Sequence, residues 1–286
     1  MNVAETIAEA RAAVGEARAA GRNVGLVPTM GALHEGHYSL IEASKAACGF
    51  TAVSIFVNPT QFGASEDLDG YPRPLEADLA GCEARGVDLA FAPSAAEMYP
   101  RPPLTKVMVE QLPDTLCGRS RPGHFAGVCT VVAKLLNIVR PDQVFFGQKD
   151  FQQSVIVRRM AADLNFGAEI VVCPTVREAD GLAMSSRNAY LTPEQRNQAP
   201  ALHASLKLAD RLLHEGKTAS EAIAAVRERL AEHAPDGEID YVQIVDPETL
   251  EDVQKPGGPV VAALAVQLGR ARLIDNLRVE LGRAEA

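Results

Sequence analysis

Short apolar runs alternate with helix-like segments through the first 175 residues of the chain. The apolar runs predict strands at residues 24–27, 52–57, 87–92, 143–146 and 169–173. Between them, the spacing of apolar positions predicts helices at residues 36–48, 75–85, 125–139 and 150–164. Alternation of this kind is typical of βαβ units, which build a parallel sheet with helices on both faces.

The pattern changes after about residue 176. Thr192 followed by Pro193 is typical of a helix start, and a single long helix is expected from there to about His214. A second helix is expected at residues 220–233, followed by strands at 239–245, 260–266 and 272–276. The sequence therefore predicts an α/β protein with a Rossmann-like parallel sheet, plus a smaller C-terminal α+β domain. The expected division is residues 1–176 and 177–286, with the second domain forming a lid over the site of the first.

Composition narrows the possible functions. Lys and Arg number 28 against 37 Asp and Glu, so the net charge of −9 offers no global attraction to nucleic acid. The five cysteines form no C-x-x-C pair, which disfavours zinc ribbons and thioredoxin-type chemistry. The first 21 residues predict an amphipathic helix rather than a signal peptide, and no apolar run approaches the roughly 20 residues that span a bilayer. We therefore expect a cytoplasmic enzyme that binds neither nucleic acid nor membrane.

Two common nucleotide motifs are absent. No G-x-G-x-x-G follows the first predicted strand. Gly216-Lys217-Thr218 resembles the end of a P-loop, but Arg211 stands where the first glycine would be, and the segment lies between two helices.

The most informative segment is residues 28–37, directly after the first predicted strand and before a helix. Ligands of doubly wound sheets bind outside the carboxyl ends of strands, and a helix N-terminus there favours phosphate. His34 and His37 are three residues apart, with Gly36 between them. Two imidazoles on one face can donate hydrogen bonds to phosphate oxygens. Two alternatives remain. The histidines could be two ligands of a metal ion, although no third ligand is evident, or they could have a purely structural role.

Three further loops carry polar side chains. Asn58 and Gln61 follow the second strong strand and can bind a polar substrate, although an Asn-Pro turn is the structural alternative. The segment at residues 145–153, at the end of another predicted strand, contains Gly147, Lys149, Asp150 and Gln153. Asp150 is also well placed as a helix cap, which is its structural alternative. The loop Met184-Ser185-Ser186-Arg187 suits a polyphosphate. Residues 58–71 are expected to form a mobile lid.

Taken together, these segments resemble one family. His34-Glu35-Gly36-His37 and the later Met184-Ser185-Ser186-Arg187 resemble the two signatures of the H-x-G-H nucleotidyltransferase superfamily. With Arg121-Pro122-Gly123-His124-Phe125 and the segments at 58–63 and 145–153, the order resembles the pantothenate synthetases (pantoate–β-alanine ligases) over most of residues 24–191.

The resemblance implies a two-step reaction. Pantoate attacks the α-phosphorus of ATP to give pantoyl adenylate and pyrophosphate, and β-alanine then displaces AMP to give pantothenate. It also implies Mg²⁺ with ATP, for which no protein ligands are assigned, and a homodimer. The carboxylate is already ionised near pH 7, so the first step needs no general base.

The resemblance further implies residue roles. The catalytic set is His37 as proton donor, with His34, Lys149 and Arg187. The ATP contacts are Met30, Gly31, His34, His37, Gly147, Gln148, Lys149, Asp150, Val176, Met184, Ser185, Ser186 and Arg187. Pantoate and β-alanine would contact Gln61, Gln153 and Asn58. The group that deprotonates the β-alanine ammonium is not identified. Another nucleotidyltransferase of the same fold and a non-catalytic nucleotide-binding protein remain as alternatives.

Overall fold

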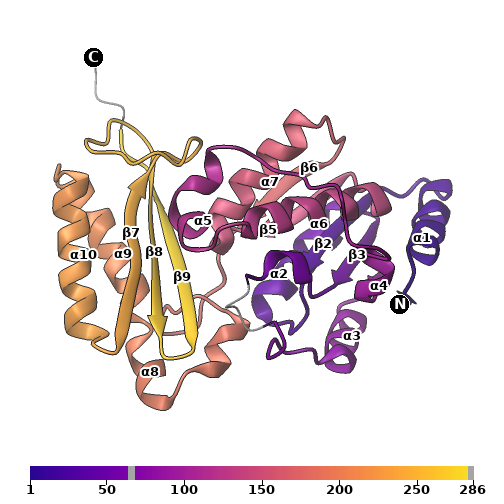
Figure 1. Cartoon of the computed structure of the whole chain (residues 1–286), viewed down its shortest axis with the longest axis horizontal. Helices are drawn as coiled ribbons and strands as arrows, with labels where there is room; N and C mark the ends of the chain where they lie inside the picture. The colour runs from indigo at the N-terminus through magenta and orange to yellow at the C-terminus, as the bar shows by residue number, and fades with distance from the viewer. Residues whose placement is uncertain (64–67, 283–286) are drawn as a thin grey trace. The chain divides into compact units, whose positions relative to one another are not determined.

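The computed structural model describes residues 1–63 and 68–282, and the chain forms two compact units (Figure 1). Unit 1 comprises Met1–Glu110, Arg121–Gln148 and Ile156–Pro174. Unit 2 comprises Gln111–Ser120, Lys149–Val155 and Thr175–Ala286. The single division expected after residue 176 stays a prediction. The expected lid at 58–71 includes residues 64–67, which lie outside the described residues.

Unit 1 is built on a six-stranded sheet in the order β1-β4-β3-β2-β5-β6, in which every strand pair is parallel. The strands are β1 (Asn2–Ala4), β2 (Val24–Thr29), β3 (Phe50–Ile55), β4 (Leu89–Phe91), β5 (Gln143–Gly147) and β6 (Glu169–Cys173). The helices of this unit are α1 (Ile7–Ala19), α2 (Glu35–Ala47), α3 (Leu75–Ala84), α4 (Ala95–Met98), α6 (His124–Val139) and most of α7 (Phe151–Asp163). The expected parallel sheet is confirmed, and β1 is an edge strand that the apolar pattern did not reveal.

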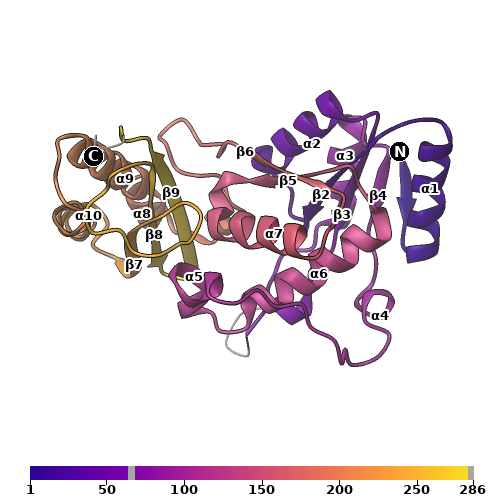
Figure 2. The same cartoon turned by 90° about the horizontal axis from the view of Figure 1, so that it is seen from above.

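Helices cover both faces of this sheet, as expected (Figure 2). On one face, α2 and α3 pack over a cluster that includes Val27, Ile41, Val53 and Cys82. On the other face, α1 and α6 contact each other and β2. The inner strands β2, β3, β4 and β5 are mostly buried on both sides, which explains why they read as continuous apolar runs.

The strand order reverses at β2, which pairs with β3 on one side and β5 on the other. The ladder between β2 and β3 continues to Thr29, whereas the ladder between β2 and β5 ends at Leu26. Pro28 follows two residues later and has no amide hydrogen to donate. The carboxyl ends of β2 and β5 are therefore neighbours without backbone pairing, which is the switch point where ligands of such sheets bind.

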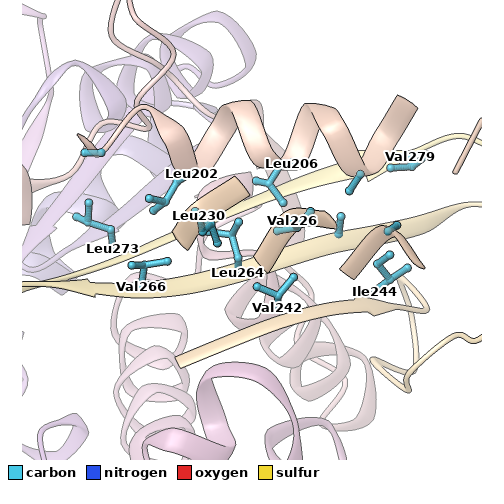
Figure 3. Packing of buried hydrophobic residues seen from close by; sticks show 14 of the residues in the cluster. Leu202, Leu206, Val226, Leu230, Val242, Ile244, Leu264, Val266, Leu273 and Val279 are labelled. Atoms are coloured by element: carbon cyan, nitrogen blue, oxygen red, sulfur yellow. The ribbon is translucent and has the colours of Figure 1, made fainter. Parts of the chain in front are cut away.

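Unit 2 contains an antiparallel sheet of β7 (Gly237–Val245), β8 (Val260–Leu268) and β9 (Ala271–Val279). Its helices are α5 (Leu116–Ser120), α8 (Pro193–Gln198), α9 (Ala201–His214) and α10 (Ala219–His233). Leucines and valines of α9, α10 and the three strands form one core, as Figure 3 shows. The other face packs on α5 and on Phe151 and Val155. The predicted α+β unit is confirmed.

The prediction of a single long helix from residue 193 to His214 is wrong. The structure has two helices, α8 and α9, separated at Ala199 and Pro200. Pro200 lacks an amide hydrogen, and its ring would clash with the carbonyl four residues earlier in a continuous helix. Proline is tolerated at a helix start, and Pro200 stands directly before α9.

Candidate functional site

The turn after β2 is held in an unusual conformation. Gly31 and Ala32 have φ values of 81° and 52°. A left-handed conformation is strained for alanine and persists only where its surroundings enforce it. Here the Asp78 carboxylate accepts hydrogen bonds from the backbone N–H groups of Ala32 (2.9 Å) and Leu33 (2.8 Å). Asp78 is on α3 and only 2% exposed, so it fixes the loop that carries Met30 and Gly31.

Sequence reasoning missed Asp78. It lies in the first turn of α3, 46 residues from Ala32, and a lone aspartate there reads as an ordinary helix-start residue. No local pattern links it to the turn after β2.

The two histidines cap the N-terminus of α2. His34 is the N-cap residue, and its Nδ1 accepts from the N–H of Gly36 at 3.1 Å. The Nδ1 of His37 accepts from the N–H of His34 at 3.3 Å, and the ring centroids are 4.1 Å apart. A neutral imidazole whose Nδ1 accepts carries its hydrogen on Nε2. The backbone therefore orients both rings as Nε2 donors, so a capping role and a ligand-binding role are compatible.

The turn after β3 orients Gln61. Pro59–Gln61 forms a 3₁₀ turn capped by Asn58, whose Oδ1 also accepts from the Tyr99 hydroxyl at 2.9 Å. The Nδ2 of Asn58 donates to Gln61 Oε1 at 3.0 Å, and Gln61 Nε2 lies 3.0 Å from the Met30 sulfur. Asn58 is 1% exposed and Gln61 is 9% exposed. Asn58 thus fixes the side chain of Gln61, which in turn contacts the loop after β2.

Helix α6 packs tightly on the same turn. His124, at its first position, hydrogen-bonds the carbonyl oxygen of Gln61 through Nδ1 at 2.8 Å, and Arg121 Nη1 is 3.1 Å from His124 Nε2. One helical turn later, a Cβ at Gly127 would lie 2.3 Å from the carbonyl oxygen of Thr60. The Arg121–Phe125 segment, for which the sequence indicated no role, therefore contributes to the position of Gln61.

A cavity of about 390 Å³ opens in unit 1 beside this loop. Its wall includes Met30, Gly31, Pro59, Asp78 and Arg73. Much of the remainder is formed by the end of β3 and by the residues that directly follow β3 and β4. The cavity is of a size that suits a small organic molecule.

Gly147 and Gln148 lie at the carboxyl end of β5, next to that of β2. Within the described residues, no heavy atom lies within 4 Å of a Cβ built at Gly147. Packing therefore does not require glycine here, which favours the close approach of a ligand to the backbone.

In unit 2, Lys149 and Asp150 form the end of a 3₁₀ turn (Gln148–Asp150) that runs directly into α7. Lys149 is half-buried and Asp150 is exposed. Gln153 follows on α7 three residues after Asp150, on the same helical face. The neighbouring Gln152 is buried, and its Nε2 donates to the carbonyl oxygens of Leu112 (2.9 Å) and Thr115 (2.8 Å).

The predicted phosphate loop follows a small hairpin in unit 2. The N–H of Met184 donates to the carbonyl oxygen of Val176 at 3.0 Å, which closes the hairpin. Ser185 caps the 3₁₀ turn Ser186–Tyr190, since its hydroxyl accepts from the N–H of Arg187 at 3.2 Å. All four residues of the loop are at most half-buried, so their side chains are accessible in this unit.

The predicted site residues thus fall into two sets. Unit 1 brings together Met30, Gly31, His34, His37, Asn58 and Gln61 around the ends of β2 and β3, with Gly147 and Gln148 at the adjacent end of β5. Unit 2 holds Lys149, Asp150, Gln153, Val176, Met184, Ser185, Ser186 and Arg187.

The cysteines are all free and buried. Burial raises the pKa of Cys82 to about 11 and that of Cys129 to about 12, so neither forms a thiolate near neutral pH. In the described part of the chain, no group of three or more His, Cys, Asp or Glu side chains could hold a metal ion. The same residues include no helix of the length and apolarity that a membrane crossing requires.

Comparison with known proteins places the chain in a family. A model described as pantoate-beta-alanine ligase matches residues 2–278. The pantothenate synthetase of Acetivibrio thermocellus is 51% identical over 281 residues, which cover 98% of this chain and 100% of the relative.

Solved structures agree. The pantothenate synthetase of Thermus thermophilus superposes with a TM-score of 0.93 at 46% identity, covering 98% of this chain and 100% of that one. A pantoate-beta-alanine ligase from Francisella tularensis, described as complexed with beta-gamma ATP and beta-alanine, gives a TM-score of 0.80 at 33% identity and covers 97% of each chain. On these full-length matches, the chain belongs to the pantoate–β-alanine ligase family.

Proposed function

We propose that the chain is an ATP-dependent ligase that condenses pantoate with β-alanine to pantothenate and releases AMP and pyrophosphate. The observation that carries the proposal is the family match over residues 2–278, because it spans every candidate residue. The relative from Francisella, described as a complex with beta-gamma ATP and beta-alanine, supports two of the three substrates.

The reaction is proposed to proceed in two steps. A carboxylate oxygen of pantoate attacks the α-phosphorus of ATP, and the bond to pyrophosphate breaks. The amine of β-alanine, once it has lost its ammonium proton, attacks the acyl carbon of pantoyl adenylate, and the bond to AMP breaks. Catalysis of the first step depends on positioning and on cations that neutralise charge at phosphorus.

His34 and His37 are assigned to the phosphates of ATP, with His37 as proton donor. The geometry of the pair supports this assignment, since each Nδ1 accepts a backbone hydrogen bond and each Nε2 is then the donor. The N-terminus of α2 adds a positive partial charge at the same place. Met30 and Gly31 are assigned to the nucleotide on the loop that Asp78 fixes.

Gln61 and Gln153 are assigned to pantoate. The support for Gln61 is its orientation by Asn58 and by the α6 contacts, which leaves a neutral amide well suited to hydroxyl and carboxylate groups. Because Asn58 is 1% exposed, we assign its contribution to the position of Gln61.

Lys149 and Arg187 are assigned to phosphate charge, and Asp150 to the ribose. Gly147 and Gln148 are assigned to contacts between the protein backbone and the nucleotide, and Val176 is assigned to adenine. Met184, Ser185 and Ser186 complete the set that would close over the phosphates. The accessible side chains of this loop and the open space at Gly147 support these roles.

Mg²⁺ is proposed to accompany ATP. This ion keeps several waters and binds through substrate phosphates with one or two carboxylates, so a cluster of protein ligands is not required. The carboxylate oxygens of Asp150, which is exposed and next to Lys149, would be available to such an ion as well as to the ribose. Bound Mg²⁺ would neutralise charge on the phosphates.

The test is pantoate-dependent exchange of labelled pyrophosphate into ATP without amine. Exchange with pantoate, followed by pantothenate formation on adding β-alanine, is the expected result. Exchange with a different acid but not with pantoate would overturn the substrate assignment. Absence of exchange with any acid would favour a non-catalytic nucleotide-binding protein.

We also propose a cytoplasmic homodimer. Five free, buried cysteines suit a reducing compartment. Light scattering coupled to size exclusion tests the dimer, since a mass near 30.5 kDa would indicate a monomer instead.

A further inference from the structure

Two segments of unit 2 carry the side chains that the proposed function assigns to phosphate: the turn at Lys149 and the hairpin that leads into the Met184–Arg187 loop. Strand β9 contacts both segments through consecutive residues, Asp275 and Asn276. Consecutive residues of a strand point to opposite faces of the sheet. These two adjacent residues of β9 can therefore hold a different segment on each face of the sheet.

Asn276 holds the Lys149 turn. Its Nδ2 donates to the carbonyl oxygen of Lys149 at 2.9 Å, across 127 residues of sequence, and Asn276 is 5% exposed. Fixing this carbonyl fixes the peptide that follows the Lys149 Cα. The direction in which the Lys149 side chain leaves the backbone is thereby constrained.

Asp275 holds the hairpin through Arg177. The carboxylate accepts from Arg177 Nη1 at 2.7 Å and from Nη2 at 2.9 Å, and Asp275 is 3% exposed. Arg177 Nη1 also donates to the carbonyl oxygen of Gly181 at 3.1 Å, so the guanidinium joins β9 to the tip of the hairpin. Val176, adjacent to Arg177, closes the hairpin on Met184.

Asp275 of this ion pair lies on β9 between two residues of the apolar core. Leu273 and Val279 of the same strand belong to the main core of unit 2. His203 Nδ1 is 3.8 Å from the Asp275 carboxylate and accepts no hydrogen bond from the described residues. A buried ion pair is often no more stabilising than an apolar pair of the same size, because desolvation offsets the attraction. The two parallel hydrogen bonds between the guanidinium and the carboxylate do, however, define the geometry of the pair.

We infer that Asp275 and Asn276 are positioning residues for nucleotide binding, acting through Arg177 and through the backbone of Lys149. This inference rests on the proposed assignment of Lys149 and Arg187 to the phosphates of ATP. Neither residue is assigned a contact with substrate, and their contribution is the placement of the two segments that are.

The test compares Asn276→Ala and Asp275→Asn with Asp240→Asn. Asp240 is a suitable control because it also pairs with an arginine of β9, Arg272, at 2.6 Å and 3.0 Å, but contacts neither phosphate segment. ATP affinity is measured by calorimetry, and kcat and KM are measured by pantoate-dependent pyrophosphate exchange.

We expect about a 10-fold or larger loss in ATP affinity and in exchange kcat/KM for the two test variants. The Asp240→Asn variant should keep wild-type values. Equal losses in all three variants would indicate a general effect of the sheet, and no loss in either test variant would overturn the inference. If Asp275→Asn does not fold, Asn276→Ala alone decides.

A second arm separates positioning from stability. In a Lys149→Ala background, Asn276→Ala should cause no further loss of ATP affinity, although its effect on melting temperature persists. An equal loss in both backgrounds would contradict action through Lys149. If the wild-type chain binds ATP without exchange, the proposed function fails while the affinity comparison still decides the inference; if it binds no ATP, both fail.

Discussion

Replacement of Gly127 by alanine tests how Gln61 is positioned. Gly127 lies on α6, where its carbonyl oxygen accepts from Asn58 Nδ2 at 3.2 Å. A Cβ at this position would lie 2.3 Å from the carbonyl oxygen of Thr60 and 2.6 Å from the Cα of Gln61. Both neighbours are backbone atoms, so the clash is not relieved by a side-chain rotation.

The size of the effect follows from these distances. Ordinary contact begins at 3.4 Å, so the turn at Gln61 must move by about 3.4 − 2.3 = 1.1 Å. Overpacking of this kind costs about 1–3 kcal/mol, and the better helix propensity of alanine offsets about 1 kcal/mol. We therefore expect the free energy of unfolding to fall by about 0–2 kcal/mol. Because Gln61 is the residue proposed to bind pantoate, a misplacement of about 1 Å should lower kcat/KM for pantoate by up to about 100-fold.

The assay combines urea denaturation with pyrophosphate exchange at varied pantoate. Gly15→Ala is the matched control, because Gly15 is in the middle of α1 and no described heavy atom lies within 4 Å of a Cβ there. That control should gain about 0.5–1 kcal/mol and keep wild-type kinetics. Wild-type pantoate kinetics in Gly127→Ala, together with a stability gain equal to that of the control, would refute the reasoning.

Three further predictions concern single side chains. Asp78→Asn leaves at least one backbone N–H of the turn after β2 poorly paired, so we expect about 1–3 kcal/mol lower stability by denaturation and a higher KM for ATP; an unchanged KM would contradict the proposed role of this loop in nucleotide binding. Lys149→Ala should lower the exchange rate by about 100-fold or more at wild-type melting temperature, by analogy with loss of one transition-state donor. Burial lowers the pKa of His203 below its ordinary 6.5, and the charge of Arg177 lowers it further, while Asp275 opposes the shift. The unfolded chain therefore binds this proton first, and stability falls as pH drops below 6.5 until the folded pKa is passed; His203→Gln should flatten that part of the stability profile in urea titrations at several pH values.

Much of the fold follows from local pattern. The apolar runs that became β2, β3 and β5 were recognisable because buried parallel strands need apolar residues on both faces. The helix starts were recognisable where caps are local, as at Thr192, whose hydroxyl accepts from the N–H of Gln195 at 3.3 Å. The helix break at Pro200 was equally local, although the predicted helix continued through it.

The sequence by itself determined the fold class and supplied the residues of the candidate site: His34 and His37 before a helix, and polar residues after successive strands. Periodicity and order along the chain suffice for these, because parallel strands bring their carboxyl ends to one edge. Only the tertiary structure decided that Asp78 fixes the turn after β2 and that Asp275 and Asn276 hold two other segments. Each of these is a single polar residue whose partners lie 45 to 127 residues away. Such a pairing leaves no local pattern, because it depends on which elements the folded chain brings into contact.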